Sequence, residues 1–287
     1  MDYTYSELTK LLINATEISQ DNNANANSQL YILENGLVFK LFIPESDYLQ
    51  NVRNLFCLKE YGELKSVKEV VLPVELIRME EDIIGYFMPY VKGRTLTTFL
   101  HDSTILPEKK LNVFVKLASA INKLPEGVYV GDLHAKNVLV DADYEVYLID
   151  IDGFSTENGE TFSVPQPLPN VRKKYYNKLG EPIVSRNSDI YCLYSMFIDW
   201  IGNGFSLLEG KYRKKYLSYL HHIEGGKLLA HQLKILYNKS DNIISPEAFR
   251  QIDVTRIFAD EYPEKIKTNK KNTKANLKIS LWERRTR

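Results

Sequence analysis

Two short apolar runs near the middle of the chain, residues 138–140 and 147–149, constrain the fold more than any other feature. The turn-forming residues 141–143, Asp-Ala-Asp, join them, which predicts a β-hairpin. Asn137 directly precedes the first run and Asp150 directly follows the second. Because a hairpin brings its two ends side by side, Asn137 and Asp150 are expected to converge on one point.

The oxygen atoms of these two side chains suit a hard cation. An amide oxygen and a carboxylate, with phosphate oxygens as further ligands, are typical of Mg²⁺ sites. Asn137 and Asp150 are therefore the predicted metal ligands. Asp132 lies five positions before Asn137 in a predicted loop. A carboxylate near the metal, without binding it, can accept the proton of an attacking hydroxyl group, so Asp132 is the predicted general base.

The segment that carries these residues resembles the catalytic loop and metal-binding turn of the protein kinase-like superfamily. The family pattern H-R-D-x-x-x-x-N reads VGDLHAKN here, at residues 130–137, and D-F-G reads Asp-Ile-Asp at 150–152. His134, two positions after Asp132, is shared with the aminoglycoside and choline kinase branch and with atypical bacterial or phage Ser/Thr kinase-like proteins. The resemblance implies ATP and Mg²⁺ as cofactors.

Lys40 is a cation inside the apolar run 37–42, where its neighbours on the same strand face are apolar. The Asn-Gly pair at 35–36 before this run predicts a second hairpin. Lys40 resembles the family's strand lysine that positions the α- and β-phosphates of ATP. The family pairs this lysine with a helix glutamate, and the spacing indicates Glu60, with Glu63 as the runner-up.

Two further matches follow the family's order along the chain. Residues 85–96 resemble the strand and hinge that receive adenine, with Met88, Pro89, Tyr90 and Val91 as the binding positions. Asp189, in a helical apolar pattern, resembles the buried aspartate that accepts hydrogen bonds from the backbone of the catalytic loop. The matches extend from about residue 12 to residue 252.

The chain also departs from the family pattern. Residues 20–28 contain no glycine where the family has a Gly-rich loop over the phosphates. Gly131 stands in place of the catalytic-loop arginine, which argues against activation by loop phosphorylation. No Ala-Pro-Glu motif follows Asp150.

Three functions are open at this point. The resemblance favours a phosphotransferase acting on a Ser/Thr hydroxyl of a protein, because residues 154–180 are long enough for an activation-like segment. A kinase for a small-molecule hydroxyl is the alternative, favoured by the Gly-Asp-Leu-His sequence at 131–134. A pseudokinase that binds nucleotide or protein partners is the third, favoured by the glycine-free residues 20–28.

The pattern of the whole chain predicts an α+β protein with a bilobal, protein kinase-like fold. Residues 1–91 read as a small antiparallel-sheet lobe with one helix, residues 92–263 as a mainly helical lobe, and residues 264–287 as a basic tail. The expected strands are 12–18, 30–33, 37–42, 70–76, 83–91, 128–140 and 145–151, and the expected helices are 5–12, 107–124, 189–201, 212–223, 227–237, 246–252 and one that Gly62 closes.

Charge is balanced overall, with 37 basic and 37 acidic residues, so the net charge of the chain does not indicate nucleic acid as a partner. Residues 264–287 nevertheless hold nine lysines and arginines against two glutamates. This tail is predicted to be solvated, with an acidic partner or nucleic acid as the functional alternative. Cys57 and Cys192 form no disulfide framework, and no apolar run approaches membrane length, so a cytoplasmic protein without a transmembrane segment is expected.

Overall fold

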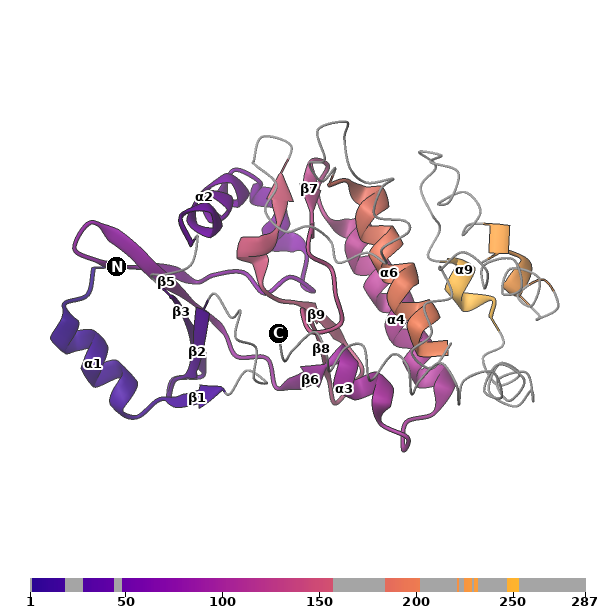
Figure 1. Ribbon diagram of the computed structural model, residues 1–287, viewed down its shortest axis with the longest axis horizontal. Coiled ribbons are helices and arrows are strands. Elements are labelled where there is room, and N and C mark those ends of the chain that lie inside the picture. The colour runs from indigo at the N-terminus through magenta and orange to yellow at the C-terminus, as the bar shows by residue number, and fades with distance from the viewer. Residues whose placement is uncertain are drawn as a thin grey trace, which may run out of the picture.

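The computed structural model describes residues 2–18, 28–43, 48–156, 184–201 and 247–252, with short pieces at 221, 225–228 and 230–231. Figure 1 shows a twisted sheet with two flanking helices at one end of the molecule and a pair of long helices toward the other. This arrangement is the α+β architecture that the sequence predicts. The boundaries of the two lobes at residues 91 and 263 stay a prediction.

The sheet has five antiparallel strands in the order β1-β2-β3-β5-β4. The strands are β1 (Thr16–Ile18), β2 (Ser28–Ile32), β3 (Leu37–Phe42), β4 (Glu75–Met79) and β5 (Asp82–Pro89). The predicted Asn-Gly hairpin joins β2 to β3, and Gly36 supplies the positive φ of +78° that this turn requires. In β3 the even-numbered side chains share one face of the sheet, so Lys40 lies beside Val38 and Phe42 in the register.

Helix α1 (Tyr5–Ile13) covers the outer face of this sheet. Thr4 begins it with a capping box, in which the Thr4 hydroxyl and the Glu7 carboxylate satisfy each other's backbone amides. Leu8 packs with Phe39, Ile77 and Phe87 in a small separate core. The helix runs to Ile13, so the strand expected over 12–18 is confined to β1.

Helix α2 (Tyr48–Lys59) covers the inner side of the sheet region and contacts the second half of the molecule at η2 and β10. Gly62 does not close it. The helix ends at Lys59, and Gly62 begins the short 3₁₀ helix η1 (Gly62–Ser66). The strand expected over 70–76 is also wrong in extent, because Val70 forms only an isolated bridge to Leu148 and β4 begins at Glu75.

The second half consists of short strands beside long helices. They are β6 (Gly93–Thr95), α3 (Leu96–His101), α4 (Pro107–Lys123), β7 (Val128–Tyr129), β8 (Val138–Asp141), β9 (Val146–Leu148), η2 (Ile151–Gly153), β10 (Ser155–Thr156), α6 (Arg186–Ile201) and α9 (Glu247–Arg250). The β8–β9 pair confirms the hairpin predicted around residues 141–143. Helices α4, α6 and α9 pack through stacked and edge-on rings of Phe114, Phe197 and Phe249.

One hydrophobic core runs through both halves. It includes Val38 and Phe42 of β3, Leu148 of β9 and Phe197 of α6. The turn η2 lies where helix α2 meets the second half, so residues of this turn are held between the two. None of the described helices is long and apolar enough to cross a membrane. The predicted helices over 212–223 and 227–237 lie largely outside the described residues, and the tail 264–287 lies wholly outside them.

Candidate functional site

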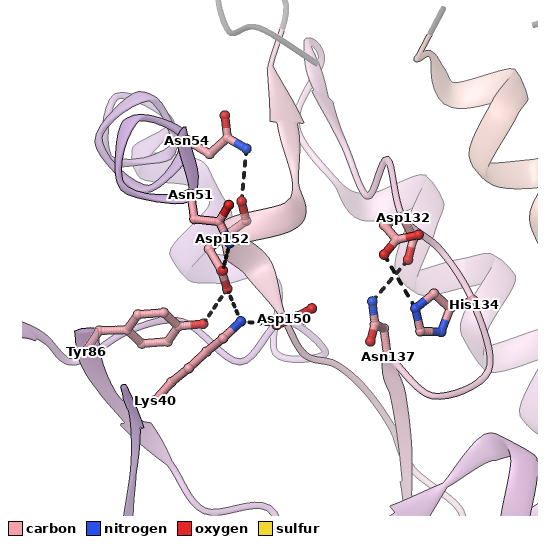
Figure 2. A network of polar contacts seen from close by, with 9 residues as sticks. All are labelled: Lys40, Asn51, Asn54, Tyr86, Asp132, His134, Asn137, Asp150 and Asp152. Atoms are coloured by element: carbon pink, nitrogen blue, oxygen red, sulfur yellow. Dashed lines mark hydrogen bonds and ion pairs between the residues drawn. The ribbon is translucent and has the colours of Figure 1, made fainter. Parts of the chain in front are cut away.

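Two groups of polar side chains lie near each other where the sheet meets the second half of the molecule (Figure 2). The first group gathers around the η2 turn and is held by elements of the sheet half; its members are Lys40, Asn51, Asn54, Tyr86, Asp150 and Asp152. The second group stands in the loop before β8 and consists of Asp132, His134 and Asn137.

Lys40 is the cation of the first group. It lies on the same face of β3 as the buried residues Val38 and Phe42, and only 5% of the residue is exposed. Its ammonium donates a hydrogen bond of 2.6 Å to Asp152 Oδ1 and forms a second ion pair with Asp150 Oδ1. Burial disfavours the charged ammonium, but the two carboxylates outweigh that effect and raise the pKa of Lys40 above its ordinary value.

Asp152 is the most fully bonded carboxylate of the site. Besides Lys40, its Oδ1 accepts a hydrogen bond of 2.7 Å from the Tyr86 hydroxyl, and its Oδ2 accepts one of 2.5 Å from Asn51. Its backbone carbonyl accepts a hydrogen bond of 2.9 Å from Asn54. Burial raises the pKa of Asp152, yet the ion pair and these donors prevail and lower it below the ordinary value. Asp152 is therefore a fixed, ionised carboxylate.

Asp150 differs from Asp152 although the two are neighbours on one turn. Its backbone is left-handed, with φ of +65°, and 39% of its side chain is exposed. In Figure 2 it contacts Lys40 from the side on which Asp132 and Asn137 lie. Desolvation raises the pKa of Asp150, opposed by Lys40 and assisted by the charges of Asp152 and Asp132. Asp150 is thus the carboxylate of this turn that a further ligand can reach.

The second group is organised by local hydrogen bonds. Asn137 Nδ2 donates to the backbone carbonyl of Asp132 at 3.2 Å, which directs the amide oxygen elsewhere. The backbone N–H of Lys136 donates to His134 Nδ1 at 3.2 Å, so the neutral ring carries its proton on Nε2. That Nε2 lies 3.4 Å from Asp132 Oδ2.

A buried aspartate of helix α6 fixes the start of this loop. Asp189 is fully buried and accepts hydrogen bonds from the backbone N–H groups of Val130, at 2.8 Å, and Gly131, at 2.9 Å. Burial raises the pKa of Asp189 to about 7 in spite of the two amides. The hydrogen bonding that the sequence indicates for Asp189 is therefore present.

The four residues central to the sequence analysis lie in two contacting pairs. Lys40 contacts Asp150, and Asp132 contacts Asn137. The β8–β9 hairpin joins the pairs, because the N–H of Ile149 donates to the Asn137 carbonyl at 3.1 Å. Among the described residues, no cluster of three or more His, Cys, Asp or Glu side chains could hold a metal ion by itself.

Glu60 is not the partner of Lys40. It lies just beyond the end of helix α2 and is exposed, as is Glu63 at the start of η1. The ion pairs of Lys40 are with Asp150 and Asp152, from the η2 turn. The prediction was wrong because it assumed a helix carboxylate, whereas α2 contributes the amides of Asn51 and Asn54.

The residues that donate hydrogen bonds to Asp152 from β5 and α2 were not predicted from the sequence. Tyr86 lies in an apolar strand pattern that predicts only burial, and Asn51 and Asn54 are uncharged. Their spacing of three does place them on one side of a helix. The sequence feature that could have indicated a role for this turn is the charged side chain of Asp152, two positions after Asp150.

The predicted hinge begins in the last two residues of β5, Met88 and Pro89, and continues beyond the strand. Met88 is 8% exposed, whereas Pro89 and Tyr90 are exposed. The N–H of Tyr90 donates to the Gly36 carbonyl at 3.1 Å, and the carbonyl of Val91 accepts from the N–H of Gly93 at 2.9 Å. These two backbone groups of the hinge are thus already paired.

Comparisons with known proteins bear on the fold. No protein-family model matches the chain, and neither does any curated protein. Many chains of solved structures do match. One is the kinase PK-1 of Cydia pomonella granulovirus, with a TM-score of 0.54 and 11% sequence identity, over 86% of this chain and 97% of that one. At this identity the similarity shows a protein kinase-like fold, which confirms the predicted fold class.

Proposed function

We propose that this chain is an ATP- and Mg²⁺-dependent phosphotransferase that transfers the γ-phosphoryl group to a hydroxyl. The observation that carries the proposal is the buried ion pair of Lys40 with the η2 turn, next to a loop that presents Asp132 and Asn137. A buried lysine in a strand contacts two turn carboxylates, and a loop carboxylate stands in the neighbouring group of polar residues. Phosphate binding explains this arrangement better than fold stability does, because buried ion pairs seldom stabilise a fold.

The residues present fit a magnesium ion. Asp150 has an exposed carboxylate, and the amide oxygen of Asn137 is left available by the hydrogen bond of its Nδ2. These two oxygens would hold Mg²⁺ with phosphate oxygens as further ligands. The ion, when bound, would neutralise charge on the transferring phosphoryl group. Lys40 would hold the α- and β-phosphates.

Asp132 serves as the general base. The acceptor hydroxyl gives its proton to the Asp132 carboxylate as its oxygen bonds to the γ-phosphorus, and the bond from that phosphorus to the bridging oxygen breaks to release ADP. His134 Nε2 lies 3.4 Å from Asp132 Oδ2, so the imidazole ring borders the carboxylate that takes the proton. Most of the acceleration comes from positioning and charge neutralisation, because the transferring group is loosely bonded in the transition state.

Adenine would lie against the hinge. The N–H of Tyr90 and the carbonyl of Val91 are already paired, so we assign recognition of the base to the Pro89 carbonyl and the Val91 N–H, with Met88 beside the ring. A Ser/Thr side chain of a protein is the proposed acceptor, and a small-molecule hydroxyl is the alternative that His134 favours.

The test combines ATP binding with turnover. We expect ATP with Mg²⁺ to raise the melting temperature, and ATP consumption to appear with a Ser/Thr protein mixture or with an aminoglycoside and choline panel. Asp132→Asn should lower kcat by about 10²- to 10⁴-fold while ATP still stabilises the fold. Asp143→Asn, an exposed residue of the β8–β9 turn, is the matched control and should behave as wild type.

The two remaining functions give different results. Stabilisation by ATP without any turnover, unchanged by Asp132→Asn, would indicate a pseudokinase. Turnover with the small-molecule panel alone would assign the acceptor class. No stabilisation by ATP would contradict the proposal.

A further inference from the structure

We infer that Asp152 is the positioning residue for Lys40, so that the carboxylate that orients the phosphate-binding lysine comes from the η2 turn and not from helix α2. This inference rests on the proposed function and deepens it. Helix α2 has the sequence YLQNVRNLFCLK, which contains no acidic residue. A glutamate of this helix is therefore unavailable to Lys40, and Glu60, the residue that follows the helix, is exposed.

The contacts of Asp152 fit this role. Its Oδ1 accepts from Lys40 at 2.6 Å and from Tyr86 at 2.7 Å, and its Oδ2 accepts from Asn51 at 2.5 Å. Tyr86 and Asn51 are neutral donors, so Lys40 supplies the balancing charge among these contacts. Both carboxylate oxygens are held in place by groups other than Lys40. Such a carboxylate stays in position when the lysine turns toward phosphate.

Helix α2 still takes part, through amides. Asn51 holds the Asp152 side chain, and Asn54 donates to the Asp152 backbone carbonyl at 2.9 Å. Helix α2 thereby fixes the η2 turn, and Asp152 of that turn fixes Lys40. The position of α2 is transmitted to Lys40 by two neutral hydrogen bonds and one carboxylate.

Asp152 is poorly suited to bind metal itself. Its side chain is 1% exposed, and each of its oxygens already accepts from a donor of the sheet half. A metal ion would have to displace Tyr86 or Asn51 to reach it. Asp150, two positions earlier, has the more exposed side chain, at 39%. The two carboxylates of the turn thus divide the work, with Asp150 for the metal and Asp152 for the lysine.

This division predicts how the two carboxylates differ when each is neutralised. Without the charge of Asp152, Lys40 has Asp150 as its one ionic partner in the turn. The lysine is then misplaced for phosphate, and magnesium has to compete with it for Asp150. Loss of Asp150 removes a metal ligand and leaves Lys40 on Asp152.

ATP binding by the full chain tests the inference. Asp152→Asn should weaken ATP affinity at least about tenfold both with and without Mg²⁺, and raise the Mg²⁺ concentration needed for half-maximal binding or turnover. Asp150→Asn should lose only the magnesium-dependent part of the affinity. The matched control is Asp143→Asn, an exposed residue of the β8–β9 turn, which should leave ATP binding unchanged.

Moving the carboxylate back to the helix provides a rescue. In Asn51→Glu/Asp152→Asn, the acid stands on α2 and the amide on the turn, and we expect at least a partial return of ATP affinity. An ATP affinity within twofold of wild type in Asp152→Asn, or a loss confined to the magnesium-dependent part, would overturn the inference.

A stability measurement keeps the inference separate from the proposed function. In a double-mutant cycle of Lys40→Met and Asp152→Asn, the coupling should amount to about tenfold or more in the unfolding equilibrium constant, and Lys40→Met with the exposed control Asp143→Asn should show none. This cycle needs no nucleotide, so absence of ATP binding in wild type would reject the proposed function alone.

If Asp152→Asn does not fold, the double variant Lys40→Met/Asp152→Asn should fold, because it removes both fully buried charges and the carboxylate that loses its partner, Asp150, has a side chain that is 39% exposed. Failure of that double variant to fold, or additive effects in the cycle, would show that Asp152 acts independently of Lys40.

Discussion

Gly131 stands where the protein kinase-like pattern has an arginine, and its backbone explains why a side chain is absent. Its φ is +73°, a left-handed conformation that L-residues adopt at a cost. A Cβ atom built on it would lie 2.9 Å from Ser155 Oγ and 3.2 Å from the Gly153 carbonyl. The packing of β10 against the loop therefore requires glycine.

We expect Gly131→Ala to destabilise the fold by about 2 to 4 kcal/mol, from backbone strain together with the displaced β10 strand. Gly36→Ala is the matched control, because Gly36 has a similar φ of +78° with no atom within 4 Å of the added Cβ. That control should lose only about 1 to 2 kcal/mol. Urea unfolding measures both variants. Equal losses would mean that the contact with Ser155 carries no cost.

At the scale of elements, the end of helix α4 depends on one side chain from α6. The last carbonyls of a helix have no partner within it. Arg186 donates to the carbonyl of Leu124 at 3.0 Å and to that of Pro125 at 3.1 Å, and also contacts the Ile121 carbonyl. One guanidinium thus caps α4 and joins it to the helix that carries Asp189.

Arg186→Ala should lower the free energy of unfolding by about 2 to 4 kcal/mol, because it removes three hydrogen bonds from a charged donor and leaves the Leu124 carbonyl with none of them, whereas the Ile121 and Pro125 carbonyls keep backbone N–H donors. Arg186→Lys should recover part of this loss, since an ammonium keeps the charge but cannot reach all three carbonyls in a fork. Chemical denaturation of the three proteins measures the order. A loss below about 0.5 kcal/mol in Arg186→Ala would contradict the capping role.

The elements that the sequence predicted well are those with local causes. The hairpins at Gly36 and at residues 141–143 follow from turn residues between apolar runs, and α4 follows from its 3.6-residue period. Helix α2 ends at Lys59, where the N–H groups of Glu60 and Tyr61 donate to carbonyls three residues back, and Gly62 begins η1, so Gly62 was a misleading signal.

The sequence predicts the polar loop residues of the candidate site, but it does not predict which carboxylate pairs with Lys40. Asp132, Asn137 and Asp150 are recognisable by spacing within one segment. The partner of Lys40 is decided by the approach of α2 to a turn about a hundred residues later, where Asn51 and Asn54 engage Asp152. Neutral amides give no charge signal along the chain, so contact in space was needed to identify Asp152 as the partner.

At the scale of the whole molecule, a single hydrophobic core links β3 through β9 to α6. Global unfolding therefore exposes buried carboxylates of both halves. Burial raises the pKa of Asp189 to about 7 and that of Asp199, on the same helix, to about 6. An unfolded aspartate titrates near about 3.9. Between these values the folded chain binds protons that the unfolded chain does not.

Acidification should consequently stabilise the fold. Because the folded state binds more protons, the free energy of unfolding rises as the pH falls from 8 to 5, by about 1 to 4 kcal/mol from Asp189 and Asp199 together. Asp152, with its lowered pKa, opposes this only below about pH 4. Urea midpoints at pH 8 and pH 5 measure the change. Asp199→Asn should be more stable than wild type at pH 8 and should gain less stability on acidification. A wild-type urea midpoint that decreases when the pH is lowered from 8 to 5 would show that Asp189 and Asp199 are ionised at pH 5 without a cost in stability.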